Sequence, residues 1–462
     1  MPATRKETDS LGEKQVPRDA YYGIQTQRAV ENFPVSGLRS DPALIRAYAR
    51  IKRSAAMVHT ELAILDAQKS HAIITAADEV IDGKLDDQFV VDVYQAGAGT
   101  SFNMNTNEVI ANRALEIMGQ PRGKYDIIHP NDDVNKSQST NDTFPTALHL
   151  AVLERWTELL PVVENLADAL DERGQRFHSF IKAGRTHLQD ATPMRLGQEF
   201  RAYADAMRRS VRLLQSSAEE LSDLAIGGSA VGTGLNVPAG YTEGMLEQLR
   251  MLTGLPLRSA PDLREAMQSR QAIGAVSGGL RGLALELTRV ANDLRLLSSG
   301  PATGLNEITL PPVQPGSSIM PAKVNPVMAE CLNMVAYQVI GNDTTVALAV
   351  QGGQLELNVF MPLMAHNVLQ SMTILTNFLP RFTEHCVAGI QANPEQMDSY
   401  AQRTAALGTV LNPALGYQRT AELIKESLAS GKEIRQLVLE KRLLSEKEID
   451  ALLSPKKLTG ES

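Results

Sequence analysis

The sequence is poor in the residues that mark several large classes of protein. Its 462 residues include only two cysteines, Cys331 and Cys386, which makes a disulfide framework implausible and fits a reducing cytoplasm. Neither cysteine belongs to a metal-type cluster, and we expect both to be small buried hydrophobic residues. No pair of histidines has metal-ligand spacing, so we predict neither a metal site nor a cofactor.

Positive charge and long apolar runs are also scarce. The chain has 45 basic against 53 acidic side chains, a formal charge of −8, and therefore no basic field for nucleic acid or an anionic membrane. No run approaches the ~20 apolar residues that span a bilayer, and the N-terminal MPATRKETDS lacks the apolar segment of a signal peptide. An anionic small substrate is still allowed, because a local pocket can be positive on an acidic surface.

The sequence does contain a series of long helical patterns. From Thr146 to Phe180 the apolar residues recur at spacings of three and four, which is typical of one stripe of an amphipathic helix. Further patterns of this kind span about 200–221, 261–297, 326–350 and 356–379. Helices of about 25 residues exceed the usual ~11–12, which predicts an elongated antiparallel bundle.

Shorter helical patches lie on either side of this bundle. We therefore expect an all-α fold, in which a central bundle is flanked by smaller, mostly helical domains at both ends of the chain. The predicted domains are 1–140, 141–393 and 394–462.

One bundle helix has a face with almost no side-chain bulk. Gly274, Gly278, Gly279 and Gly282 lie in it, and each costs about 1 kcal/mol of helix propensity. Close approach of another helix would offset that cost, whereas the alternative is a helix that breaks near Gly278. We expect the bundle to associate with copies of itself.

One loop combines the groups needed to remove a weakly acidic proton from carbon. Gly316 to Asn325 reads GSSIMPAKVN, and its glycine and proline predict an exposed, mobile connection. It contains two adjacent hydroxyls, Ser317 and Ser318, followed by the ammonium of Lys323 and the amide of Asn325. Abstraction of a proton beside a carboxylate requires such a base, a cation and hydrogen-bond donors together.

Two further polar stretches precede predicted helices. GAGTSFNMN, from Gly97, places Thr100 and Ser101 at a helix N-terminus that suits a carboxylate, although a plain turn also explains its glycines. HPNDDVNKSQSTND, at 129–142, brings together hydroxyl and amide groups just before a long helix. A helix cap would account for one of the last three candidates, but not for all of them. These candidates are Ser139, Thr140 and Asn141.

His187 differs from most other histidines in its surroundings. It lies beside Thr186 in AGRTHLQD, a break between two bundle helices, whereas six others lie in helical or amphipathic contexts. A histidine at a bundle end that is paired with a carboxylate can carry a proton near neutral pH. The alternative is an ordinary loop histidine. His129, in the second polar stretch, is a weaker candidate.

The stretches at 97–108, 129–142, 184–190 and 316–326 together resemble the aspartase and class II fumarase superfamily, and GSSIMPAKVNP is close to its signature sequence. The resemblance runs over nearly the whole chain. It implies a homotetramer with a twenty-helix core and active sites shared by three subunits. It also implies anti elimination across a Cα–Cβ bond of a succinyl compound, which releases fumarate.

The resemblance also implies roles for individual residues. Ser317 would be the base, as an alkoxide, with its pKa lowered by Lys323 and by backbone N–H groups once the loop closes. Glu330 would orient His187. The charge on the intermediate would be held by Ser318, Lys323 and Asn325. The rest of the substrate would be bound by Thr100, Ser101, Ser139, Thr140, Asn141, Thr186 and His187. A second, peripheral anion site is suggested by His129, Asn131 and Asp132.

The leaving group is ammonia or water, and only the resemblance separates the two. Thr140 within STND, Ala322 in MPAKVNPV and Gln354 favour the aspartase side, whereas HPNDDVN from His129 is typical of fumarases. We expect elimination of ammonia from L-aspartate, with the malate and fumarate reaction as the alternative. A divalent activator, as in some aspartases, is allowed but not predicted. A non-catalytic member would require erosion of loops that are intact here.

Overall fold

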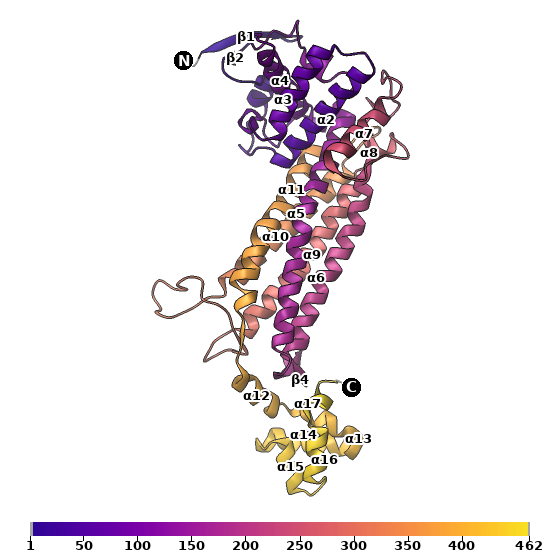
Figure 1. Ribbon diagram of the computed structural model, residues 1–462. Coiled ribbons are helices and arrows are strands. Elements are labelled where there is room, and N and C mark those ends of the chain that lie inside the picture. The colour runs from indigo at the N-terminus through magenta and orange to yellow at the C-terminus, as the bar shows by residue number, and fades with distance from the viewer. Residues whose placement is uncertain (1–2, 461–462) are drawn as a thin grey trace. The chain divides into compact units, whose positions relative to one another are not determined.

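The structure, a computed structural model, describes residues 3–460 and is mainly helical (Figure 1). The chain divides into two compact units. The first comprises Met1–Leu160, Arg212–Ala284 and Tyr337–Thr376, and the second comprises Pro161–Val211, Leu285–Ala336 and Asn377–Ser462. The division into three domains stays a prediction.

Five long helices contribute residues to both units. They are α5 (Thr140–Arg176), α6 (Leu196–Ala218), α9 (Gln271–Leu297), α10 (Val327–Gln351) and α11 (Met361–His385) (Figure 1). Each corresponds to a predicted helical pattern, although α9 begins ten residues later than the pattern from 261. A short helix, α8 (Glu265–Gln268), precedes it, and the Ser269 hydroxyl, between the two helices, accepts a hydrogen bond from the Gln271 N–H at the start of α9. Because α9 continues through its glycines, the alternative of a break near Gly278 is wrong.

The first unit packs its shorter helices around an aromatic centre. The Tyr48 ring meets the rings of Phe102 and Phe144 edge to face, with centroids 5.3 Å and 5.8 Å apart. This contact fixes α4 (Thr100–Ile117) against the beginning of α5. The shorter elements are β1 (Thr4–Asp9), β2 (Gly12–Pro17), α1 (Ile24–Asn32), α2 (Pro42–Glu61), α3 (Ala67–Ile81), η1 (Asp86–Gln88), η2 (Gly97–Gly99), α4 (Thr100–Ile117), η3 (Pro130–Val134), η4 (Glu219–Ser222), β5 (Asp223–Leu224), α7 (Tyr241–Thr253) and β6 (Arg258–Ser259).

The second unit contains a helical C-terminal part, as predicted for the end of the chain. Its small core includes Leu423, Leu437 and Ile449, all buried. The elements of this unit outside the long helices are β3 (Ile181–Thr186), β4 (Gln189–Arg195), β7 (Ile308–Thr309), η5 (Val387–Gly389), β8 (Gln391–Ala392), α12 (Pro394–Arg403), η6 (Ala405–Leu411), α13 (Asn412–Leu415), α14 (Tyr417–Ser430), α15 (Ile434–Glu440), α16 (Glu446–Leu452) and α17 (Pro455–Leu458).

The break predicted at 183–190 is a β-hairpin. Strands β3 and β4 pair in antiparallel fashion, with Thr186 opposite Gln189, so only two residues form the turn. Both of them, His187 and Leu188, have left-handed backbone angles, with φ of 55° and 58°. Two consecutive residues in this conformation match the right-handed twist of the paired strands.

Two features of the composition are also visible in the structure. Cys386 is buried, as expected, and burial raises the pKa of its thiol to about 12, whereas Cys331 is only partly buried. Within residues 3–460, no helix has the length and apolar character needed to cross a membrane.

Candidate active site

One hydrogen bond joins the beginnings of α4 and α5. The Asn103 side-chain Nδ2 donates to the Thr140 hydroxyl oxygen across 3.0 Å, and both residues are buried. Gly99, just before α4, has a φ of 83°, and a Cβ at this position would overlap the Phe144 ring. The close approach that this glycine allows is therefore to α5, and Thr100, the first residue of α4, is left exposed.

The three polar residues at the start of α5 do different things. Ser139 is the cap of the helix, because its hydroxyl accepts from the Asn141 N–H at 3.1 Å. The Asn141 side chain donates to the carbonyl of Ala230 at 2.9 Å, and the Thr140 hydroxyl accepts from Asn103. The capping explanation thus applies to Ser139, and the other two side chains are held in fixed positions beside it.

A buried lysine lies behind Thr140. Lys52 is fully buried, and its Nζ donates to Asn103 Oδ1 at 2.9 Å, Asn135 Oδ1 at 2.8 Å and Gln138 Oε1 at 2.9 Å. Three amide oxygens match the three N–H groups of an ammonium, although burial lowers the pKa of Lys52 to about 7. Sequence reasoning missed Lys52; its only signal is a lysine within the apolar helical pattern of α2.

Asp142 is a second buried charge in this region. Its carboxylate accepts from the N–H groups of Ser139 at 3.0 Å, Gly227 at 3.2 Å and Ser229 at 3.0 Å. Burial raises the pKa of Asp142 to about 7, while these hydrogen bonds and the charge of Lys52 act in the opposite direction. The carboxylate ties the segment around Gly228 to the start of α5.

Ser101 is buried and lines a cavity, unlike the exposed Thr100. It lines a space of about 490 Å³ together with His129, Asn131, Arg28 and Glu108. Adjacent residues of a helix point in different directions, which separates Ser101 from Thr100. His129 and Asn131, predicted for the second anion site, therefore lie together here, whereas Asp132 is outside the lining. The Arg28 guanidinium is held by both oxygens of Asp9 at 2.9 Å, so its charge is already paired.

The hairpin that carries His187 has a firmly held base and an exposed tip. Buried Lys182 pairs with Glu199 at 2.7 Å and with buried Glu307 at 3.0 Å, and Arg185 donates to Glu307 at 2.8 Å. At the tip, His187 is exposed and its imidazole has no partner within residues 3–460. A left-handed conformation at a non-glycine residue costs about 1 kcal/mol, and such strain is concentrated at functional sites.

The loop from Gly316 to Asn325 folds back on itself. The Gly316 N–H donates to the Lys323 carbonyl at 3.0 Å, and the Asn325 side-chain amide donates to the Gly316 carbonyl. Inside this ring, the Ser317 hydroxyl oxygen accepts from the backbone N–H groups of Ile319 at 3.3 Å and Met320 at 3.0 Å. Two N–H groups aimed at one oxygen stabilise negative charge on it.

The same loop presents its charged and polar groups to solvent. Ser318 and Lys323 are exposed, and a cavity of about 490 Å³ is lined by residues that include Ser317 and Lys323. Regular structure is absent from 310 to 326, which confirms the predicted exposed connection. Glu330 lies in the first turn of α10, and no hydrogen bond or ion pair within residues 3–460 joins it to His187. Its orienting role stays a prediction.

The predicted residues thus form separate groups within one chain. Thr100, Ser139, Thr140 and Asn141 belong to the first unit and surround the starts of α4 and α5. The hairpin residues Thr186 and His187 belong to the second unit. So do Glu330 of α10 and the loop residues Ser317, Ser318, Lys323 and Asn325.

Comparison with known proteins identifies the family. Residues 12–341 match the lyase family model, and residues 407–460 match the model of the fumarase C C-terminus. An aspartate ammonia-lyase of a Bacillus species is 48% identical over 98% of this chain and 97% of that one. A class II fumarate hydratase of Ralstonia nicotianae is 45% identical over 99% of both chains.

The fold is shared as well as the sequence. The crystal structure of fumarate lyase:delta crystallin from Brucella melitensis bound to cobalt superimposes with a TM-score of 0.95 at 48% identity, covering 98% of this chain and 99% of that one. Such similarity over the full length, at both the sequence and the fold level, shows that this chain belongs to the aspartase and class II fumarase superfamily of lyases.

Proposed function

We propose that the protein is an aspartate ammonia-lyase that converts L-aspartate reversibly to fumarate and ammonia. The observation that carries this proposal is the position of the Ser317 oxygen, which receives two backbone N–H groups in a loop that also contains Lys323. A free serine hydroxyl is too weak a base to remove a proton from carbon. Backbone N–H groups and an ammonium nearby stabilise the alkoxide and lower the pKa of the hydroxyl.

The reaction follows from these groups. The Ser317 alkoxide takes a proton from the carbon next to the carboxylate that is remote from the amine. The electron pair moves into that carboxylate, and the resulting aci-carboxylate is stabilised by Lys323, Ser318 and Asn325. The pair then forms the double bond while the C–N bond breaks, and fumarate and ammonia leave. Closure of the exposed loop would exclude water and strengthen each of these interactions.

The other half of the substrate would be held by the residues of the hairpin and of the helix starts. Helix N-termini suit a carboxylate, and α4 and α5 both begin with a threonine. In the proposal these groups bind the amine and the second carboxylate. They are Thr100, Ser101, Ser139, Thr140, Asn141, Thr186 and His187, with Glu330 orienting His187.

We infer that the site is completed by association into a homotetramer. Leu213, Met334 and Leu348 lie on long helices and expose 64%, 65% and 60% of their surface, apolar area that packing against another helix would remove from water. On α9, a Cβ on Gly278 or Gly282 would meet no other atom of residues 3–460 within 4 Å, so space remains for another helix. These features support packing of the bundle against copies of itself.

A class II fumarate hydratase is the second candidate, because its relatives are nearly as similar, at 45% against 48% identity. The two are distinguished by incubating the purified protein with L-aspartate and, separately, with L-malate, and by following the ultraviolet absorbance of fumarate. We expect fumarate from aspartate. Fumarate from malate alone would overturn the proposal, and Ser317→Ala serves as the control for a contaminating activity.

A further inference from the structure

A buried arginine of the first unit has no partner for most of its guanidinium. Arg270 exposes only 2% of its surface, and its Nε and one terminal nitrogen have no hydrogen-bond partner within residues 3–460. Burial lowers the pKa of this side chain to about 10, while the carboxylate of Glu265 acts in the opposite direction, so the group is charged at neutral pH. A buried charge without a partner is unfavourable, and such groups are normally paired.

Arg270 faces a cavity. It lines a space of about 320 Å³, together with His149 from α5, Ala272 and Ala275 from α9, and Glu265 from α8. Arg270 directly precedes α9, a helix of 27 residues, so the positive end of the helix dipole lies at the same cavity. Two independent features, the unpaired guanidinium and the helix terminus, thus favour an anionic group here.

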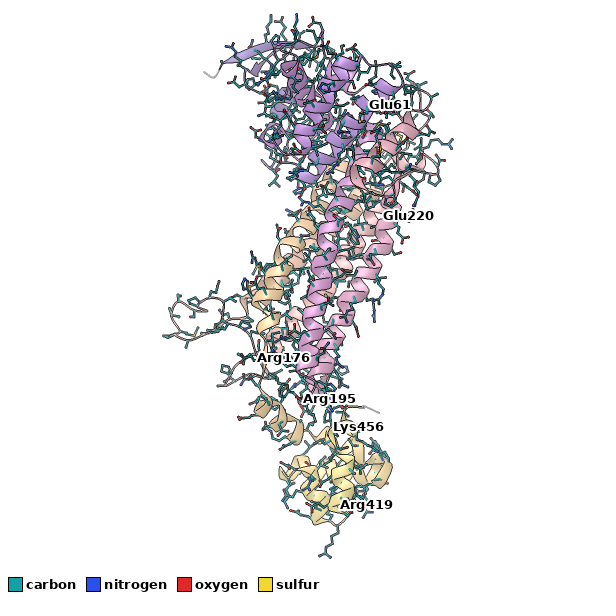
Figure 2. The ribbon with its side chains drawn as sticks, in the orientation of Figure 1. Glu61, Arg176, Arg195, Glu220, Arg419 and Lys456 are labelled. Carbon is teal, nitrogen blue, oxygen red and sulfur yellow. The ribbon has the colours of Figure 1, made fainter. Side chains whose placement is uncertain are left out.

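The remaining lining of the cavity limits what kind of anion fits. Glu220 (Figure 2) and Glu265 are exposed and have no ion pair within residues 3–460, so they form an acidic rim above the buried Arg270. This rim would repel a ligand with several negative charges. A third carboxylate in the lining, that of Asp223, is paired with Arg258. The lining also includes small apolar surfaces from Ala260, Pro261, Ala266, Ala272 and Ala275.

We propose that this cavity binds a small amino acid as a zwitterion. Its carboxylate lies against the Arg270 guanidinium, its ammonium lies between Glu220 and Glu265, and a short apolar side chain contacts the alanines of α8 and α9. His149 stays neutral beside the carboxylate, because burial and the neighbouring Arg270 cation lower its pKa to about 3, while the hydrogen bond between its Nδ1 and the Asp223 carbonyl acts in the opposite direction. The site contains none of the residues of the proposed reaction and does not rest on that proposal.

Calorimetric titration of the full-length protein with three matched probes tests this inference. L-Alanine has both charges, propionate lacks the ammonium and ethylamine lacks the carboxylate. We expect L-alanine to bind once per chain, propionate to bind about fivefold more weakly because rim carboxylates are exposed, and ethylamine to give no signal. Failure of L-alanine to bind at about 10 mM, or binding of propionate as tight as that of L-alanine, would overturn the proposal.

Substitutions locate the binding. Arg270→Met should weaken L-alanine binding by about tenfold or more, because a hydrogen-bonded charge pair is lost. Ala275→Leu keeps the guanidinium, fills the cavity and should also abolish binding, so the test survives if one variant folds poorly. Unchanged affinity in folded Arg270→Met and Ala275→Leu proteins would place the amino acid elsewhere.

A matched pair of rim variants tests the ammonium. Glu220→Gln should reduce the difference in binding affinity between L-alanine and propionate. Glu219→Gln changes an exposed neighbour outside the cavity and should leave this difference in affinity unchanged. Thr140→Val alters the proposed substrate site and should leave L-alanine binding intact. Loss of binding in Thr140→Val would instead assign the bound amino acid to the substrate site and overturn the inference.

Discussion

The amide of Asn103 lies between Lys52 and Thr140 and fixes which way the Thr140 hydroxyl points. Its oxygen accepts from the Lys52 ammonium at 2.9 Å, so its NH₂ group must face Thr140, to which it donates at 3.0 Å. The Thr140 oxygen is therefore an acceptor toward the protein interior. Its own proton is left to be donated outward, which suits a substrate carboxylate.

Asn103→Asp is expected to reverse this arrangement. A carboxylate at 103 still accepts from Lys52 but has no N–H to offer, so Thr140 must donate its proton to the new side chain. We expect KM for the substrate to rise about tenfold while kcat changes less, since a hydrogen bond to a charged group is lost in both the ground and transition states. Steady-state kinetics measure both constants. An unchanged KM would exclude the proposed orientation of Thr140.

Ser317→Ala is expected to remove the base while leaving the loop in place. Turnover should fall by about 10³-fold or more, because no neighbouring group can take the proton. Ser318→Ala, in the adjacent position, is the matched control and should retain measurable activity with a raised KM. Size-exclusion chromatography with light scattering should show the same oligomer for both variants. Equal activity of Ser317→Ala and the native protein would eliminate Ser317 as the base.

Gly99→Ala is expected to destabilise the contact between α4 and α5. The residue has a φ of 83°, and a Cβ would overlap the Phe144 ring, so backbone strain and overpacking act together. The free energy of unfolding should fall by about 3 kcal/mol in urea titrations. Gly12→Ala controls for the backbone strain alone. Gly12 also has a positive φ, of 108°, but a Cβ there would meet no atom of the described chain within 4 Å. The free energy of unfolding of this variant should fall by only about 1 kcal/mol. Equal losses in the two variants would contradict the steric role.

The burial of His59 predicts that the protein loses stability in mild acid. It is fully buried, stacks on Tyr241 with ring centroids 5.1 Å apart, and its ring nitrogens have no hydrogen-bond partner within residues 3–460. Burial lowers the pKa of His59 from 6.5 to about 4. Above pH 6.5 the ring is neutral in both states; as the pH falls toward 4, only the unfolded state takes up the proton. About 2 kcal/mol of stability should therefore be lost between pH 6.5 and pH 5.

His59→Phe isolates this contribution. The aromatic contact with Tyr241 is retained and the titrating nitrogens are removed, so the free energy of unfolding should depend less steeply on pH. Urea denaturation between pH 5 and pH 7.5 measures the slope. His71→Gln, at an exposed position of α3, is the matched control and should keep the native slope. A slope that His59→Phe leaves unaltered would show that other groups cause the acid sensitivity.

Much of the architecture could be read from periodicity. Apolar spacing located all five long helices, because a stripe at every third or fourth residue is a local property of the chain. The start of α9 was misplaced, since the hydrogen bond to Ser269 and the separate α8 are visible only once the backbone is built. The hairpin at His187 was expected as a loop for a similar reason: its turn has two left-handed non-glycine residues, which composition does not signal.

The candidate chemistry was likewise visible only in part. The sequence by itself identified the loop with Ser317 and Lys323, the helix starts at Thr100 and Thr140, and the helical class, because each depends on residues that are neighbours along the chain. Only the tertiary structure revealed that Lys52 orients Asn103, that Lys182 and Glu307 anchor the hairpin, and that two nitrogens of the Arg270 guanidinium are buried without a hydrogen-bond partner. These relations join segments far apart in sequence. Burial and the partners that it brings together decide whether a charged side chain there is paired, has its pKa shifted or is left to bind a ligand.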